Sequence, residues 1–104
     1  MNSEITFYKR FEENILNGKK TITIRDANEK DYDSGTTVDV STFEDNLWFC
    51  SIIILSVVPV KFNELNEFHA EQENMTLEEL KKVIHAIYPG IEELYIISFE
   101  LVKS

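Results

Sequence analysis

Residues 47–62, LWFCSIIILSVVPVKF, form the longest apolar stretch of the chain and point to a protein built around a β-sheet. The stretch is nearly continuous in Trp, Phe, Ile and Val, and its β-branched residues favour a strand over a helix. Ser56 and Pro59 interrupt it, and it is far too short to span a bilayer. We therefore expect one long, bent strand, or two successive strands broken around Pro59.

Shorter patterns on the N-terminal side predict a helix followed by a second strand. Thr6 can cap a helix that begins near Phe7, and Gly18 is placed to end it. Alternation of polar and apolar residues over 21–25 then predicts a strand with Thr23 and its alternate neighbours on one face.

The remaining patterns complete an α+β fold. Strands are expected at residues 37–42 and 94–101, and helices at residues 63–72 and 76–88, the last with a capping box at Thr76. About five strands and three helices in this order predict a small, partly closed, mixed β-barrel with helices packed over its openings. The length of 104 residues fits a single domain spanning residues 1–104.

Charge and cysteine content exclude several classes of function. The net charge of −9 opposes binding of long nucleic acid, although five of the ten basic residues lie within residues 1–25 and suit a compact polar or anionic ligand. Cys50 is the only cysteine, so neither an internal disulfide nor a Cys-based zinc site is expected. Without a recognisable signal peptide or membrane span, we expect a cytoplasmic protein with no membrane partner.

Lys20, Thr23 and Arg25 are the first candidates for chemistry. A threonine hydroxyl becomes a nucleophile when a base takes its proton, and a lysine can be that base when it is partly neutral. Period-two counting puts Lys19, not Lys20, on the Thr23 face, unless the strand begins only at Thr21. Periodicity therefore leaves the choice of lysine open, and an ordinary solvated strand edge is the alternative interpretation.

Glu73 is a second candidate, because it lies between two predicted helices, where a carboxyl group can project from a loop into a cleft and donate a proton. The alternative interpretation is that Glu73 is an ordinary solvated carboxylate at the surface. His69-Ala70-Glu71 has the His-x-Glu form of zinc nucleobase deaminases, but their Pro-Cys-x-x-Cys partner is absent. His69 and His85 fall on separate predicted helices without ligand spacing, so we expect no metal site.

Residues 18–26, GKKTITIRD, resemble the active-site segment of the small ASCH-domain amidohydrolases that remove the acetyl group from N(4)-acetylcytidine. Residues 69–76, HAEQENMT, resemble the same enzymes, and the similarity continues in order along nearly the whole chain. The resemblance implies that Lys20 is the proton acceptor, Thr23 the nucleophile and Glu73 the proton donor. It also implies a PUA-like barrel and a reaction without a cofactor.

The wider ASCH superfamily has the pattern Gly-x-Lys-x-x-Glu-x-Arg in this segment. Gly18, Lys20 and Arg25 match it, whereas Thr23 stands where the pattern has Glu, in agreement with the amidohydrolase branch. We therefore expect deacetylation of N(4)-acetylcytidine, a small-molecule nucleoside. Strand parity puts Arg25 on the Thr23 face, where it can bind the substrate or stabilise an oxyanion.

Alternatives to this function and mechanism stay open. A PUA-like RNA-binding module without catalysis rests on analogy of fold alone. A general small amidase acting on other acylated bases is a further possibility. Within the hydrolase hypothesis, Lys20 can also activate a water directly, with Thr23 only orienting it.

Overall fold

The computed structural model describes residues 3–102, which form five strands and three α-helices. The strands are β1 (Glu4–Phe7), β2 (Ile22–Arg25), β3 (Thr37–Thr42), β4 (Trp48–Lys61) and β5 (Glu93–Leu101). The helices are α1 (Glu12–Leu16), α2 (Glu67–Gln72) and α3 (Leu77–Ile87), and short 3₁₀ turns cover Lys9–Phe11, Ala27–Glu29 and Phe62–Glu64. The expected α+β class is confirmed. None of the helices in the described part of the chain is long and apolar enough to cross a membrane.

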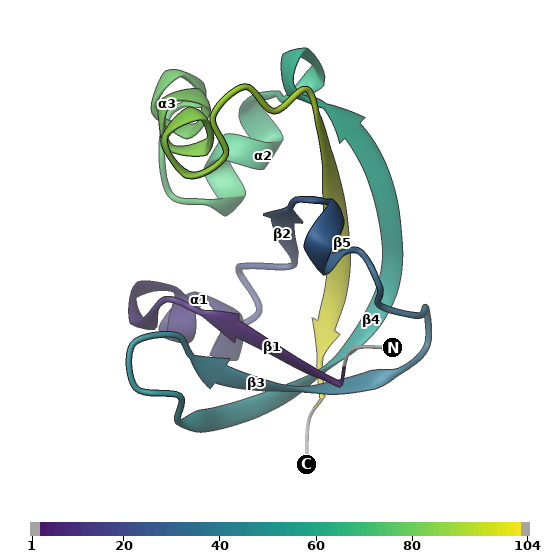
Figure 1. Cartoon of the computed structure of the whole chain (residues 1–104). Coiled ribbons are helices and arrows are strands. Elements are labelled where there is room, and N and C mark those ends of the chain that lie inside the picture. Colours follow the sequence, from purple (N-terminus) through teal and green to yellow (C-terminus); the bar gives the residue numbers. More distant parts are fainter. Residues whose placement is uncertain (1–2, 103–104) are drawn as a thin grey trace.

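The strands form one mixed sheet in the order β1-β3-β4-β5-β2 (Figure 1). Only β1 and β3 run parallel, and the other neighbours are antiparallel. The apolar segment forms the single long, bent strand β4, whose register against β5 shifts between Ile54 and Ser56. Pro59 lies inside the ladder opposite Tyr95, so the alternative of a break at Pro59 is wrong. A bulge at this shift bends a strand without ending it.

The sheet is open, which corrects the expectation of a partly closed barrel. Strands β1 and β2 are its two edges, and within residues 3–102 they do not pair with each other. A side chain bridges them instead: Arg25 of β2 donates from Nη2 to the carbonyl oxygen of Thr6 in β1 at 2.7 Å. A closed barrel needs a continuous ladder of backbone hydrogen bonds between its two edge strands. A single side-chain contact does not supply one, so the architecture is an open sheet.

The predicted helix from Phe7 is wrong at its beginning. Residues 4–7 form β1, in which Ile5 and Phe7 point into the core, and Thr6 caps no helix. Pairing with β3 provides the backbone partners that a helix would otherwise supply, so tertiary contacts override the local capping pattern at Thr6. The helix is confined to α1, and Gly18 follows it in the left-handed conformation at φ 80°, as expected for a helix end.

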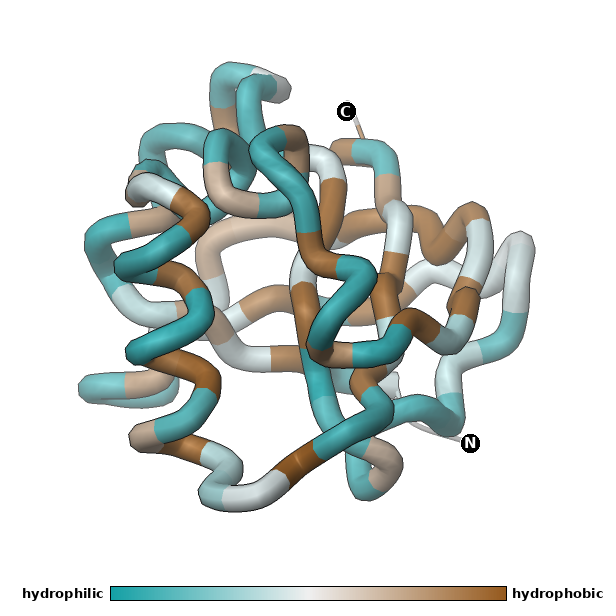
Figure 2. Tube along the Cα trace, turned by 90° about the horizontal axis from the view of Figure 1, so that it is seen from above, coloured by the Kyte–Doolittle hydropathy of each residue, from teal (hydrophilic) through white to brown (hydrophobic). Residues whose placement is uncertain are grey.

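The apolar side chains form two buried clusters. One contains the first half of β4 and the second half of β5, together with residues of β1, β3 and α1. The other joins α2 and α3 to the end of β4 and the beginning of β5. Hydrophobic residues follow the strands, whereas the outer loops are mostly hydrophilic (Figure 2). The capping box at Thr76 is confirmed, because its hydroxyl accepts from the Glu79 N–H and the Glu79 side chain accepts from the Thr76 N–H. The candidate site lies between the two clusters.

Candidate active site

Lys20 is a buried cation just ahead of β2. The backbone turns inward after Gly18, and the Lys20 N–H donates to the Asn14 carbonyl at 3.0 Å. Lys20 is 2% exposed, and its ammonium lies 4.7 Å from the centre of the Phe11 ring. Lys19 is exposed. The structure therefore buries Lys20 rather than Lys19, because β2 begins only at Ile22 and strand parity does not reach back to either lysine.

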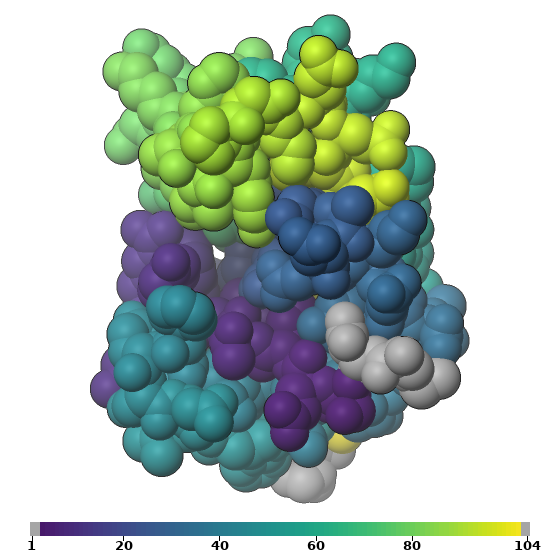
Figure 3. All heavy atoms as spheres, in the orientation of Figure 1, coloured from purple at the N-terminus to yellow at the C-terminus, as the bar shows by residue number. Residues whose placement is uncertain are grey.

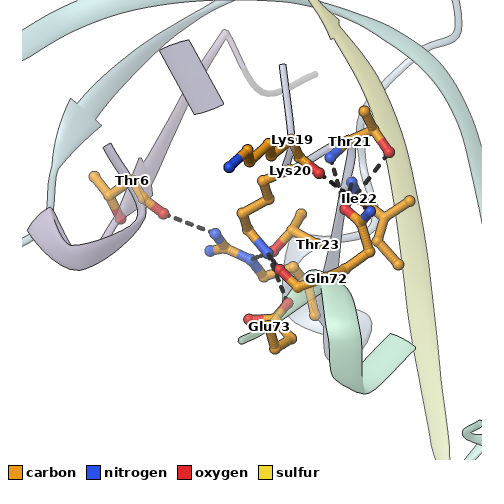
Figure 4. A network of polar contacts seen from close by, with 9 residues as sticks. Thr6, Lys19, Lys20, Thr21, Ile22, Thr23, Gln72 and Glu73 are labelled. Atoms are coloured by element: carbon orange, nitrogen blue, oxygen red, sulfur yellow. Dashed lines mark hydrogen bonds and ion pairs between the residues drawn. The ribbon is translucent and has the colours of Figure 1, made fainter. Parts of the chain in front are cut away.

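Glu73 lies beside Lys20, although 53 positions separate the two residues in the sequence (Figure 4). It follows the last residue of α2, and its Oε1 lies 2.9 Å from Lys20 Nζ. The same ammonium also donates to the Gln72 carbonyl at 3.4 Å, at the helix C-terminus, where a positive charge is favoured. Both side chains of the ion pair are largely removed from water. In a buried ion pair of this kind, a proton can pass between the amine and the carboxylate.

The pKa of Lys20 is lowered from its ordinary value, chiefly because burial penalises the charged amine. The charge and hydrogen bond of Glu73 raise this pKa, while the nearby guanidinium groups of Arg25 and Arg10 lower it. Burial and like charges together thus exceed the effect of the ion pair. A neutral amine is accordingly more accessible here than in a solvated lysine, which is what a general base requires.

Thr23 stands in the middle of β2 and is 4% exposed. Its hydroxyl oxygen accepts a hydrogen bond from Arg25 Nε at 3.0 Å, which leaves the hydroxyl proton free to be donated. Among the described residues, the hydrogen bonds of the Lys20 ammonium go to Glu73 and Gln72, and none goes to Thr23.

Arg25 is held by three partners besides the Phe7 ring, which lies 4.9 Å from its guanidinium carbon. It donates to Thr23, to the Thr6 carbonyl and, at 2.9 Å, to Glu29 Oε1. An arginine has five N–H donors, so two remain for a ligand. Its expected place on the Thr23 face is confirmed, and the structure adds that Arg25 orients the threonine.

Gln72 is a residue of this site that the sequence patterns did not single out. Its Oε1 accepts from the Thr21 N–H at 2.7 Å and the Ile22 N–H at 3.3 Å, and its Nε2 donates to the Lys19 carbonyl at 3.2 Å (Figure 4). The side chain thereby joins the end of α2 to the backbone on both sides of Lys20. Its position beside Glu73 was the only signal available in the sequence.

A pocket of about 350 Å³ opens over Thr23, Arg25 and Glu73. Its upper wall is apolar and comes from Met75 and α3, whereas its lower wall comes from the N-terminal segment and Phe43. Figure 3 shows a hollow between the green atoms of α3 and the purple and teal atoms of these lower elements. The volume is at the small end of the range for ligand pockets, which suits a small molecule.

Both histidines and Cys50 lie outside this pocket. His69 is tied into the N-terminus of α2, where its Nδ1 accepts from the Asn66 N–H, and His85 packs against the Phe62 ring. Burial raises the pKa of the Cys50 thiol to about 11, which keeps it protonated and unreactive at neutral pH. Within residues 3–102, no group of three His, Cys, Asp or Glu side chains is placed to hold a metal ion.

An open mixed sheet with two helices over one end, and a buried lysine just ahead of an edge strand, characterise this α+β domain. The ASCH domain model matches residues 3–103, and the chain belongs to the ASCH domain family. The solved ASCH domain from Lactobacillus crispatus JV V101 has a TM-score of 0.75 at 17% identity, covering 95% of this chain and 79% of that chain. The ASCH protein from Zymomonas mobilis has a TM-score of 0.71 at 14% identity, covering 96% and 69%. These likenesses show the fold.

Much more similar relatives bear a functional name. A protein of Vibrio vulnificus (strain YJ016) is 64% identical over 100 residues, covering 96% of both chains, and is named N(4)-acetylcytidine amidohydrolase. A protein of Shewanella sp. (strain MR-4) with the same name is 56% identical over 103 residues, covering 99% of this chain and 100% of its own. The similarity to both therefore extends over nearly the full length.

Proposed function

We propose that this protein hydrolyses N(4)-acetylcytidine to cytidine and acetate, acting as a single cytoplasmic domain. The observation that carries the proposal is the buried Lys20–Glu73 ion pair, whose Glu73 lines a pocket of nucleoside-compatible size together with Thr23. The names of its full-length relatives support the same substrate. The chemistry is acyl transfer, first to the threonine and then to water.

Acylation begins with a proton shift inside the pair. Moving one proton from the Lys20 ammonium to the Glu73 carboxylate gives a neutral amine beside a neutral acid. Lys20 then takes the Thr23 proton while the threonine oxygen attacks the acetyl carbonyl carbon. Glu73 protonates the exocyclic nitrogen as the amide bond breaks, releasing cytidine and leaving an acetylated threonine.

Deacylation reverses these proton movements and restores the pair. After acylation, Lys20 is an ammonium and Glu73 a carboxylate. Glu73 takes a proton from an incoming water, whose oxygen attacks the acetyl carbon, and Lys20 returns its proton to the Thr23 oxygen as that bond breaks. Acetic acid leaves and ionises in water, so no cofactor is needed to balance the cycle.

Arg25 supports both steps without moving a proton. Its Nε–H holds the Thr23 oxygen. Arg25 also lines the pocket, where its remaining N–H donors can stabilise the negative charge on the acetyl oxygen of each tetrahedral intermediate. The competing mechanism, in which Lys20 activates water directly, uses the same residues but forms no acetyl-threonine.

An assay of the purified protein with N(4)-acetylcytidine tests the proposal directly. We expect release of equal amounts of cytidine and acetate, measured by chromatography, without added metal. Comparing the acetylated base, ribonucleoside and deoxynucleoside distinguishes a narrow enzyme from a general amidase. Absence of deacetylation, together with salt-sensitive submicromolar binding of RNA, would instead establish the non-catalytic module, which the net charge of −9 disfavours.

Replacing Gln72 is expected to slow the reaction without unfolding the protein. Gln72→Leu removes its contacts to the Thr21, Ile22 and Lys19 backbone, so the distance between Lys20 and Glu73 is no longer held. We expect kcat to fall by about 10- to 100-fold with KM changed far less, because orientation of the reacting groups is lost.

Two further variants separate positioning from general damage. Gln72→Glu retains an acceptor for both N–H groups and introduces a carboxylate near Lys20, so it should recover part of kcat while moving the pH dependence. Glu71→Gln alters the exposed neighbour and should leave the kinetics unchanged. An unaltered kcat in a folded Gln72→Leu protein would contradict the role of Gln72.

A further inference from the structure

Two aromatic side chains, Tyr8 and Phe43, stand exposed at the lower wall of the pocket. Tyr8 is 44% exposed and Phe43 61% exposed, although both are large and apolar. Their ring centres are 5.2 Å apart in an edge-to-face arrangement, and both side chains line the pocket that contains Thr23. An exposed aromatic pair that continues a ligand pocket is a surface on which a planar ring can stack.

The surrounding backbone holds this pair in place. The Phe43 N–H donates to the Phe7 carbonyl at 2.8 Å, and the Lys9 N–H donates to Glu44 Oε1 at 3.0 Å. Lys9 Nζ also forms an ion pair with Asp45 at 2.8 Å. Three contacts therefore fix the β3–β4 turn against the segment that carries Tyr8, so the two rings are pre-organised before any ligand arrives.

Arg10 adds a cation to the same wall. Its guanidinium carbon lies 4.6 Å from the centre of the Phe11 ring and 5.8 Å from that of Tyr8. Within residues 3–102 no carboxylate forms an ion pair with Arg10, and its side chain lines the pocket. Its N–H donors are consequently available to an oxygen on a ligand.

The upper wall is mostly aliphatic, and Tyr88, directly after α3, adds an aromatic ring with a hydroxyl group. Leu80, Val83, Ile84 and Ile87 of α3 present aliphatic side chains to the pocket. A flat ring between this wall and the aromatic pair would make apolar contacts on both faces. The reactive groups Thr23 and Glu73 are at the floor, so an acyl group placed there leaves the ring toward the mouth.

We infer that Tyr8, Phe43 and Arg10 form the subsite for the pyrimidine ring, with one aromatic ring stacking on its face, the other packing against its edge, and Arg10 donating to its carbonyl oxygen. This inference rests on the proposed function, because it takes the acetyl group to lie at Thr23. It extends that function by assigning base recognition to a part of the chain outside the Lys20, Thr23 and Glu73 group.

Leucine substitutions at the two rings test the subsite. We expect Tyr8→Leu and Phe43→Leu each to raise KM for N(4)-acetylcytidine by about 10-fold, within the range found for a base stacked on an aromatic side chain. The value of kcat should change far less, since neither residue contacts the reacting atoms. Tyr8→Phe retains the ring and should retain the wild-type KM.

Trp48→Leu is the matched control, because Trp48 is as exposed as Phe43, at 61%, but does not line the pocket. Its KM should stay at the wild-type value. Binding of the product cytidine, measured by calorimetry with the same variants, gives a readout independent of catalysis. We expect affinity for cytidine to fall in Tyr8→Leu and Phe43→Leu and to persist in Trp48→Leu.

The outcomes distinguish the subsite from the proposed function. Unchanged KM and cytidine affinity in the leucine variants of an active enzyme overturn the subsite and leave the function intact. An inactive wild-type protein whose cytidine affinity depends on Tyr8 and Phe43 overturns the function and supports the subsite. A wild-type protein that neither reacts nor binds cytidine overturns both.

Discussion

Thr23→Ala is expected to lower kcat/KM for N(4)-acetylcytidine by about 10³-fold or more, because it removes the proposed nucleophile and leaves only binding and electrostatic stabilisation. The protein should remain folded, since the lost hydroxyl makes one hydrogen bond, with Arg25. Thr23→Ser retains a hydroxyl and should recover part of the rate. The measurement is steady-state kinetics beside urea unfolding of each variant.

Mass spectrometry after a rapid quench decides whether the threonine is acetylated. We expect an added acetyl group on the peptide containing Thr23 in the wild-type enzyme and none in Thr23→Ala. Single-turnover reaction without such an adduct would instead support direct attack by water. Near wild-type activity of Thr23→Ala would show that Thr23 neither attacks the substrate nor orients the attacking water.

Glu73→Gln is expected to lower kcat/KM for the amide by about 10²- to 10⁴-fold, the range associated with loss of a general acid. The amide nitrogen must be protonated before it leaves, whereas a nitrophenolate leaves without a proton. The first turnover of p-nitrophenyl acetate should therefore be much less affected by Glu73→Gln, and still abolished by Thr23→Ala. Equal losses of both reactions in Glu73→Gln would argue against the acid role.

The pH dependence of the same variant follows from the charges around Lys20. Glu73 raises the Lys20 pKa, whereas burial, Arg25 and Arg10 lower it, so removing the carboxylate lowers this pKa further. Neutral Lys20 is then present at lower pH, and the rising limb of the ester burst should move to lower pH than in the wild type. A shift to higher pH would contradict the assignment of Lys20 as the base.

Local patterns in the sequence correctly predicted several strands and the start of one helix. Alternation identified β2, the apolar stretch identified β4, and the capping box placed the start of α3 at Thr76. These features depend on neighbours within a few residues, which is why the printed sequence suffices for them. The same patterns named Thr23 and Arg25 as side chains of one strand face.

Tertiary structure alone decided which residues meet. Burial of Lys20 instead of Lys19 depends on the turn after α1, and Glu73 and Gln72 reach Lys20 across more than fifty residues of chain. Residues 4–7 became an edge strand because β3 supplied partners for their backbone, although the sequence predicted a helix cap at Thr6. Sheet pairing and the seam between two apolar clusters are set by long-range contacts, which no periodicity within a segment encodes.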